Sequence, residues 1–301
     1  MLSRKNKLLL LKIFGLFAVV RGYNVMVLAL AQYLAAIYIF SPDLSVRQVL
    51  FDPKLFLLVV ASSLCIASGY IINSFYDAEK DLINRPHRTA WERLISQRSR
   101  LLTYFSLNFL AVFVAVLVSF RAAVFFGAYI FGIWIYSVRL KKLTLIGNLV
   151  SAFLTITPFF AVFVYYKNFQ EVIFAHATVL FLFLLMRELT KDLENLKGDL
   201  VKNYRTIPVV YGEQISKAAF SILSLVTIVV IFILVNRFPI GYMYLYYYGC
   251  VAILVLLLVF LWKSKSKIHY VLLHNLLKII IVSGVFSILL IDVDLLLRKI
   301  F

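Results

Sequence analysis

Long apolar segments separated by short polar loops run along almost the whole chain. Nine of them are mostly apolar over about 20 residues, the length that a helix needs to cross the hydrocarbon core of a bilayer. They cover residues 23–41, 55–76, 101–120, 122–138, 145–166, 171–190, 216–236, 240–262 and 271–295. Hydrophobic residues make up 63% of the chain, against roughly 45–50% in a soluble domain. The pattern predicts an all-α membrane protein with nine transmembrane helices. No Pro/Gly/Ser-rich linker interrupts it, so we expect a single domain over residues 1–301.

An additional apolar stretch at residues 8–20 ends before the first predicted span. It is followed by Arg21 and Asn24. We therefore expect residues 4–20 to form an amphipathic helix at the cytoplasmic membrane interface, with Lys12 on its polar side. A cleaved signal peptide is the alternative interpretation, but no small-x-small cleavage motif precedes the next apolar segment.

Basic residues alternate in density from loop to loop. Lys and Arg are frequent before the first predicted span and after the second, fourth, sixth and eighth, whereas the intervening loops hold few. By the positive-inside rule, this places the N-terminus in the cytoplasm and the C-terminus outside. The net charge of +17 is therefore mainly a topology signal, part of which also suits anionic lipid headgroups or an anionic substrate. Nucleic acid is not expected as a partner, because the basic residues do not form one stripe.

Two polar motifs stand at corresponding ends of two apolar segments. Each contains one Asn and two Asp residues: Asn73, Asp77 and Asp81 in the first, and Asp192, Asn195 and Asp199 in the second. Residues three or four positions apart lie on one face of a helix. The charge pattern places both motifs on the cytoplasmic side. Carboxylate and amide oxygens that face one another across a bundle can hold Mg²⁺, which binds phosphate oxygens in turn. We therefore predict a Mg²⁺ site that handles a diphosphate.

A solvated helix end is the alternative interpretation of either motif alone. Lys80 lies between Asp77 and Asp81 and would balance their charge in water. A second acidic motif at the same membrane face favours a functional site, because the coincidence would have to occur twice. Glu79 and Glu194 lie off the shared helix faces, so we expect both to be solvated.

Basic residues adjoin the first motif in sequence or lie in another loop on its side of the membrane. Arg85 and Arg88 follow the motif, and Lys141 follows the fourth predicted span. Topology alone would explain each of them. Together they would surround an anion held by the metal, because Arg grips phosphate oxygens in pairs and Lys acts as a point charge.

These motifs resemble the signatures of the UbiA superfamily of intramembrane prenyltransferases, and the resemblance covers nearly the whole chain. An Asn and two Asp residues followed by Asn-x-Pro-x-Arg match that family at residues 73–88. An acidic helix end that leads to a Thr-Ile-Pro-Val turn matches at 187–209. A Tyr-Ser-x-x-Leu-Lys stretch at 136–141 and an Arg-x-x-Asn at 21–24 are also typical of the family.

The resemblance implies a nine-helix bundle around a central cavity, in the cell membrane of a prokaryote. It implies Mg²⁺-dependent transfer of a prenyl group from an allylic prenyl diphosphate to an acceptor in the membrane. Asp77, Asp81 and Asp199 would be catalytic and would hold the metal, with the other three polar residues of the two motifs assisting. Asn24 would bind substrate. Five further residues would bind the diphosphate: Arg21, Arg85, Arg88, Tyr136 and Lys141.

Three positions depart from the family pattern. Asn195 stands where the second signature usually has Asp, which removes one negative charge but keeps an amide oxygen as a potential ligand. Ser74 stands where Asp is common. Residues 89–92 replace a usual Pro-x-Pro-Ser-Gly segment. The metal role of Asn195 and the choice of acceptor therefore stay open at this point.

The acceptor has two candidate classes. Residues 187–195 and 206–213 look closest to bacterial members labelled geranylgeranylglycerol-phosphate geranylgeranyltransferases, which predicts a glycerol-phosphate lipid precursor. An aromatic quinone precursor is the alternative within the family. A cation or small-molecule transporter is the alternative from another class. It is disfavoured because the acidic residues cluster at one membrane face, beside Lys and Arg side chains that would repel a cation.

Overall fold

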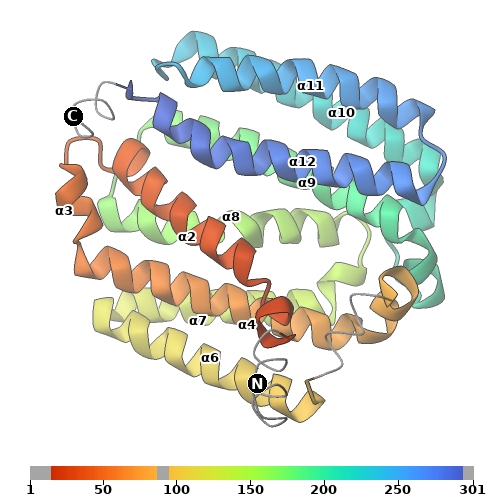
Figure 1. Ribbon diagram of the computed structural model, residues 1–301, viewed down its shortest axis with the longest axis horizontal. Coiled ribbons are helices and arrows are strands. Elements are labelled where there is room, and N and C mark those ends of the chain that lie inside the picture. Colours follow the sequence, from red (N-terminus) through yellow and green to blue (C-terminus); the bar gives the residue numbers. More distant parts are fainter. Residues whose placement is uncertain (1–14, 87–94, 294–301) are drawn as a thin grey trace, which may run out of the picture. The chain divides into compact units, whose positions relative to one another are not determined.

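The computed structural model describes residues 15–86 and 95–293, which form helices and no β-strand (Figure 1). Nine helices in these residues are long and apolar enough to cross a membrane, which confirms the predicted all-α membrane fold. They are Gly22–Phe40 (α2 and η1), Pro53–Asn84 (α4), Gln97–Val118 (α6), Phe120–Lys142 (α7 and η2), Ile146–Tyr166 (α8), Glu171–Val201 (α9), Ile207–Arg237 (α10), Met243–Lys263 (α11) and Lys267–Leu290 (α12 and η3). The shorter elements are α3 (Val46–Leu50), the π-helix η1 (Ala36–Phe40), and the 3-10 helices η2 (Leu140–Lys142) and η3 (Ile288–Leu290).

Two of the helices run well past their predicted ends. α4 continues to Asn84 and α9 to Val201, whereas the apolar pattern ends at residues 76 and 190. Hydropathy falls at these ends because polar side chains occupy the buried face, but the backbone stays helical. Both polar motifs therefore lie on regular helix rather than in loops.

The seventh span begins earlier than the apolar pattern indicates. α10 starts at Ile207, with Pro208 in its first turn, where the missing N–H of proline leaves no hydrogen bond unmade. Gly212 interrupts the helix with φ 84°, a conformation that glycine adopts without steric cost. Residues 207–211 before the kink are apolar but too few to span a membrane, and the polar Glu213 and Gln214 follow it, which explains why the pattern showed only the span from residue 216.

Several predictions fall on residues outside those that the structure describes. Most of the expected interfacial helix at 4–20 lies in residues 1–14, and Arg88 and residues 89–92 lie in 87–94. Within the described part of that N-terminal stretch, residues 15–19 are helical. Val19 is buried and packs with Ile71 and Ile72 of α4.

The chain divides into two compact units, each with its own helix packing. The first comprises Met1–Ala29 and Phe51–Lys141. In it, α4 contacts both α6 and α7, and α6 contacts α7. A polar contact also joins α4 to α6, because the Ser68 hydroxyl donates to Asn108 Oδ1 at 2.6 Å. Such interhelical hydrogen bonds matter in a membrane, where apolar burial distinguishes a neighbouring helix poorly from lipid.

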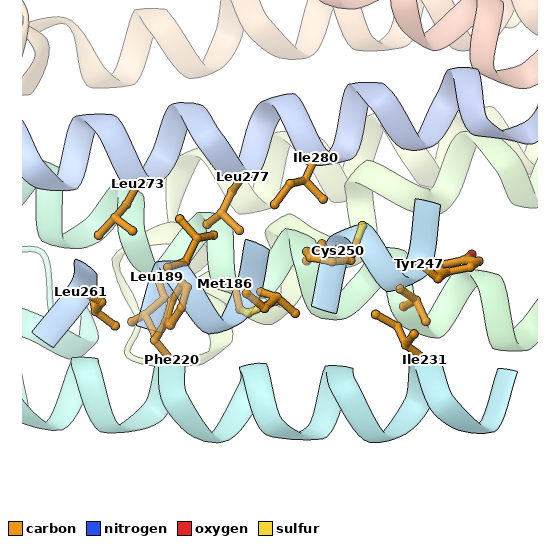
Figure 2. Packing of buried hydrophobic residues seen from close by; sticks show 14 of the residues in the cluster. Met186, Leu189, Phe220, Ile231, Tyr247, Cys250, Leu261, Leu273, Leu277 and Ile280 are labelled. Atoms are coloured by element: carbon orange, nitrogen blue, oxygen red, sulfur yellow. The ribbon is translucent and has the colours of Figure 1, made fainter. Parts of the chain in front are cut away.

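The second unit comprises Leu30–Leu50 and Lys142–Phe301. Its central helix is α9, which contacts α8, α10 and α12. Figure 2 shows the apolar packing around α9, with Met186 and Leu189 among side chains of the neighbouring helices, including Phe220 and Leu277. This packing holds the polar end of α9 within the unit.

Candidate active site

The first polar motif lies on the last third of α4. Asp77 is 6% exposed, and Asn73 and Asp81 are half-buried. α4 begins at a capping residue: Asp52 accepts hydrogen bonds from the backbone N–H groups of Lys54 and Leu55. The four-residue spacing then directs all three side chains to a common face.

A buried lysine contacts this motif. Lys141 lies on η2, and its Nζ donates to Asp77 Oδ1 at 2.8 Å and to Asn73 Oδ1 at 3.2 Å. Lys80 Nζ lies 3.7 Å from the same carboxylate oxygen. The solvated-end interpretation therefore does not describe Asp77, which is buried between two ammonium groups. A buried charge of this kind is costly unless it is paired, so the Lys141 contact stabilises the motif as it stands.

Arg21 and Asn24 meet at an aromatic residue of α4. The guanidinium carbon of Arg21 lies 4.8 Å from the centre of the Tyr70 ring, and Asn24 Nδ2 donates to the Tyr70 hydroxyl at 3.2 Å. Sequence analysis missed Tyr70, although it stands three residues before Asn73 and therefore on a neighbouring part of the same helix face. Arg21 itself has φ 49°, at the break before α2.

Arg85, Tyr136 and Arg88 are the other predicted diphosphate ligands. Arg85 ends α4, and its backbone N–H donates to the carbonyl oxygen of Asp81 at 2.7 Å. Tyr136 is half-buried on α7. Arg88 lies outside the described residues.

The second polar motif is buried along one face of α9. Asp192, Asn195 and Asp199 are 8%, 6% and 1% exposed. Asn148 of α8 donates from Nδ2 to Asp192 Oδ2 at 2.8 Å. The family-like stretch at 136–141 is followed by Gly147-Asn148, which is also typical of the family, but Asn148 was given no role in the site.

One turn before Asp192, the buried carboxylate of Glu188 contacts two cationic side chains. Glu188 Oε1 accepts from Arg187 Nη2 at 2.7 Å, and Lys191 Nζ donates to Glu188 Oε2. These contacts hold the Lys191 ammonium on Glu188. In the first motif, by contrast, Lys141 contacts Asp77, a member of the motif itself.

The prediction that Glu194 is solvated is wrong. Glu194 is buried, and its Oε2 lies 2.6 Å from Nδ1 of the buried His274 on α12. The helix face opposite the motif is covered by α12 rather than by water, which hydropathy could not reveal. Glu79 is exposed, as predicted.

The donor set suits a hard cation that brings some of its own ligands. Among residues 15–86 and 95–293, no group of three His, Cys, Asp or Glu side chains forms a ready-made metal cluster. Mg²⁺ usually takes only one or two carboxylates and completes its shell with water and substrate phosphates. Each unit by itself offers buried carboxylate oxygens of this kind, from Asp77 in the first unit and from Asp192 and Asp199 in the second.

Comparison with known sequences finds one matching family and relatives that share one name. The sequence model of the UbiA prenyltransferase family matches residues 25–277. Digeranylgeranylglyceryl phosphate synthase of Thermococcus sibiricus is 36% identical over 163 residues, which cover 54% of this chain and 57% of that protein. The protein of the same name from Methanobrevibacter smithii is 30% identical over 209 residues, 66% of this chain and 69% of that protein. The chain thus matches little more than half the length of the first of these relatives.

Solved structures show the same fold at low sequence identity. A structure described as digeranylgeranylglyceryl phosphate synthase in membranes has a TM-score of 0.66 and 20% identity, covering 92% of this chain and 97% of that one. A UbiA homologue from Archaeoglobus fulgidus bound to GPP and Mg²⁺ has a TM-score of 0.66 and 13% identity, covering 91% and 99%.

Proposed function

The chain belongs to the UbiA prenyltransferase family, and on this premise we propose that it transfers a prenyl group from an allylic prenyl diphosphate to an acceptor in the membrane. The observation that carries the proposal is the buried contact of Lys141 with Asp77 and Asn73, an ammonium group placed on a carboxylate motif. Such a group can pass from the carboxylate to a diphosphate when a metal takes its place. The single family match spans both compact units, which supports one functional domain over residues 1–301.

We assign Mg²⁺ binding to the residues of the two polar motifs, one motif in each unit. Asp77, Asp81 and Asp199 would hold Mg²⁺, assisted by Asn73, Asp192 and Asn195. When bound, Mg²⁺ supplies positive charge that neutralises the leaving diphosphate. The support is the repeated motif in the sequence, the burial of Asp77 and of the three α9 residues, and the Mg²⁺ in the Archaeoglobus fulgidus homologue.

The other polar residues have separate tasks in this scheme. Lys141, Arg21 and Arg85 would hold the diphosphate oxygens where negative charge builds, with Arg88 and Tyr136 also in contact. Asn24 would bind substrate, and its hydrogen bond to the Tyr70 hydroxyl would hold its side chain in place. The bond between the allylic carbon and the diphosphate oxygen breaks, a bond forms from that carbon to an acceptor hydroxyl oxygen, and the hydroxyl proton is released. Apolar surroundings would exclude water as a competing nucleophile.

For the acceptor we propose a glycerol-phosphate lipid precursor. Relatives at 28–36% identity carry the name digeranylgeranylglyceryl phosphate synthase, which indicates a prenylated glycerol phosphate as substrate. An aromatic quinone precursor remains the alternative within the family. A transporter function gains no support, because Asp77 is neutralised by lysine rather than open to a passing cation.

An acceptor panel tests the proposal. Purified protein in lipid nanodiscs is given labelled geranylgeranyl diphosphate, with or without Mg²⁺, and either a prenylglycerol phosphate, its dephosphorylated alcohol or an aromatic hydroxy acid. We expect product only with Mg²⁺ and the phosphate-bearing acceptor. Product with the aromatic acid alone would replace our acceptor by the alternative, and no transfer to any acceptor would contradict the enzyme assignment.

We also propose that the N-terminus is cytoplasmic and that the site opens to the cytoplasm of a prokaryotic cell. The support is the alternation of basic loops. Both native cysteines, Cys65 and Cys250, are buried, so introduced cysteines can be labelled selectively. In intact cells we expect a membrane-impermeant maleimide to label Asp43→Cys but not Ser266→Cys. The reverse result would invert the topology.

The Asn195→Asp substitution tests the unusual member of the second motif. Asn195 is buried on the face that it shares with Asp192 and Asp199, so a new carboxylate there would add negative charge to the same cluster. We expect lower thermal stability without Mg²⁺, from carboxylate repulsion, and a lower half-saturating Mg²⁺ concentration, from a stronger site for a hard cation. Turnover need not rise, because product diphosphate would also be held more firmly. An unchanged Mg²⁺ titration would remove Asn195 from the metal site.

A further inference from the structure

The back of α9 carries a buried polar pair that the proposed chemistry does not use. Glu194 and His274 are 7% and 4% exposed, and they join α9 to α12 through a 2.6 Å contact between Oε2 and Nδ1. Their nearest chain neighbours, Leu193 and Leu273, belong to the apolar core of the second unit. The pair is thus a buried polar contact between the two helices, and Lys278 of α12 and Arg187 of α9 are electrostatic neighbours of His274.

The position of Glu194 on the helix is informative. With 3.6 residues per turn, Asp192, Asn195 and Asp199 fall within a sector of about 60°. Glu194 projects about 100–160° away from each of them. The polar motif and the polar pair therefore occupy different sides of the same helical turns.

The free energy of folding alone does not require such a pair. Removing a carboxylate from water is costly, and replacing a buried polar pair by apolar side chains is often neutral or stabilising. The best-attested use of such pairs is to specify register. In a membrane this need is greater, because lipid tails and leucine side chains are equally apolar and leave the rotation of a helix weakly determined.

We infer that Glu194 and His274 are positioning residues that fix the rotation of α9 about its axis, and so aim Asp192, Asn195 and Asp199 at the metal. This inference rests on the proposed function. A helix whose back is held only by leucines can rotate by several degrees, which displaces the oxygens on its opposite side. Metal sites tolerate such displacement poorly, and loss of supporting contacts typically weakens metal affinity by about 10- to 100-fold.

The same helix provides a matched control at its other end. His176 Nδ1 lies 2.5 Å from the hydroxyl of Tyr247 on α11. This contact also joins α9 to a neighbour through a histidine, but it stands 16 residues before Asp192, about 24 Å along the helix. Its removal should loosen α9 without turning the polar motif.

The test compares the double variants Glu194→Leu/His274→Leu and His176→Leu/Tyr247→Phe with the unaltered protein. Mg²⁺ is titrated at a fixed concentration of inorganic diphosphate, and its binding is read as the rise in melting temperature. Transfer rate is a second readout. We expect Glu194→Leu/His274→Leu to melt at or above the normal temperature without Mg²⁺, yet to need about 10-fold more Mg²⁺ for half-saturation in both readouts. His176→Leu/Tyr247→Phe should keep the normal half-saturation. His274→Asn, which keeps an amide donor near the place of Nδ1, should also stay near normal.

Three outcomes would overturn the inference. A normal Mg²⁺ requirement in Glu194→Leu/His274→Leu would make the pair a packing feature only. An equal rise in the His176→Leu/Tyr247→Phe control would show general loosening of α9. An unaltered protein that Mg²⁺ and diphosphate do not stabilise would overturn the proposed metal site, and this inference with it, whereas the first two outcomes leave the proposed function intact.

Discussion

The Asp77→Asn substitution is expected to lower the rate of prenyl transfer by about 10²- to 10³-fold, the usual effect of removing one preorganised electrostatic group. The amide keeps the shape of the side chain and an oxygen for Lys141, but it removes the charge that a hard cation requires. The sequence alone suggests that the change would relieve repulsion between carboxylates. The structure instead places Asp77 beside Lys141 and Lys80, so we expect a lower melting temperature without substrate.

Glu79→Gln is the control for this experiment. It removes the same charge two residues later on α4, at an exposed position. Transfer rates for the two variants are compared over a Mg²⁺ titration, with melting temperature as a check on folding. Near-normal turnover of Asp77→Asn in saturating Mg²⁺ would remove Asp77 from the catalytic site.

The Lys141→Met substitution is expected to lower the rate of transfer strongly but to strengthen Mg²⁺ binding, the opposite of the effect of Asp77→Asn on the metal. Lys141 donates to Asp77 and Asn73 in the substrate-free protein, so its ammonium competes with Mg²⁺ for the same oxygens. Removing it should lower the Mg²⁺ concentration that half-saturates the protein without diphosphate. Turnover should fall by about 10²-fold or more, because the leaving diphosphate loses a fixed positive charge.

Lys142→Met is the matched control, since the next residue is exposed and its ammonium lies 5.5 Å from the centre of the Tyr204 ring instead. Calorimetric titration of Mg²⁺ in the absence of diphosphate measures the first effect, and the transfer assay measures the second. If Lys141→Met bound Mg²⁺ more weakly than the unaltered protein, competition between the lysine and the metal would be ruled out.

These two substitutions separate roles that activity alone would merge. Asp77→Asn should weaken Mg²⁺ binding, and Lys141→Met should strengthen it, although both lose turnover. The difference follows from one contact of 2.8 Å between the two side chains. It therefore tests whether Lys141 exchanges between a carboxylate and a diphosphate during the reaction cycle.

Helix spacing is a local property, so the sequence could predict which polar residues share a helix face. The four-residue intervals in α4 set Asn73, Asp77 and Asp81 on one face wherever the helix lies. Tyr70 could have been added by the same reasoning. By contrast, no spacing rule links Lys141 to Asp77, because the two are 64 residues apart and on different elements.

The sequence by itself determined the membrane class, the nine spans and the helix faces that carry the polar motifs, because segment length and side-chain periodicity follow from the chain alone. Only the tertiary structure decided what each polar residue contacts. It placed Lys141 on Asp77, Asn148 on Asp192 and His274 on Glu194. It also reversed the expectation for Glu194. The physical reason is that a carboxylate on a helix is solvated or buried according to which other helix covers that face, and hydropathy along one helix carries no information about its neighbours.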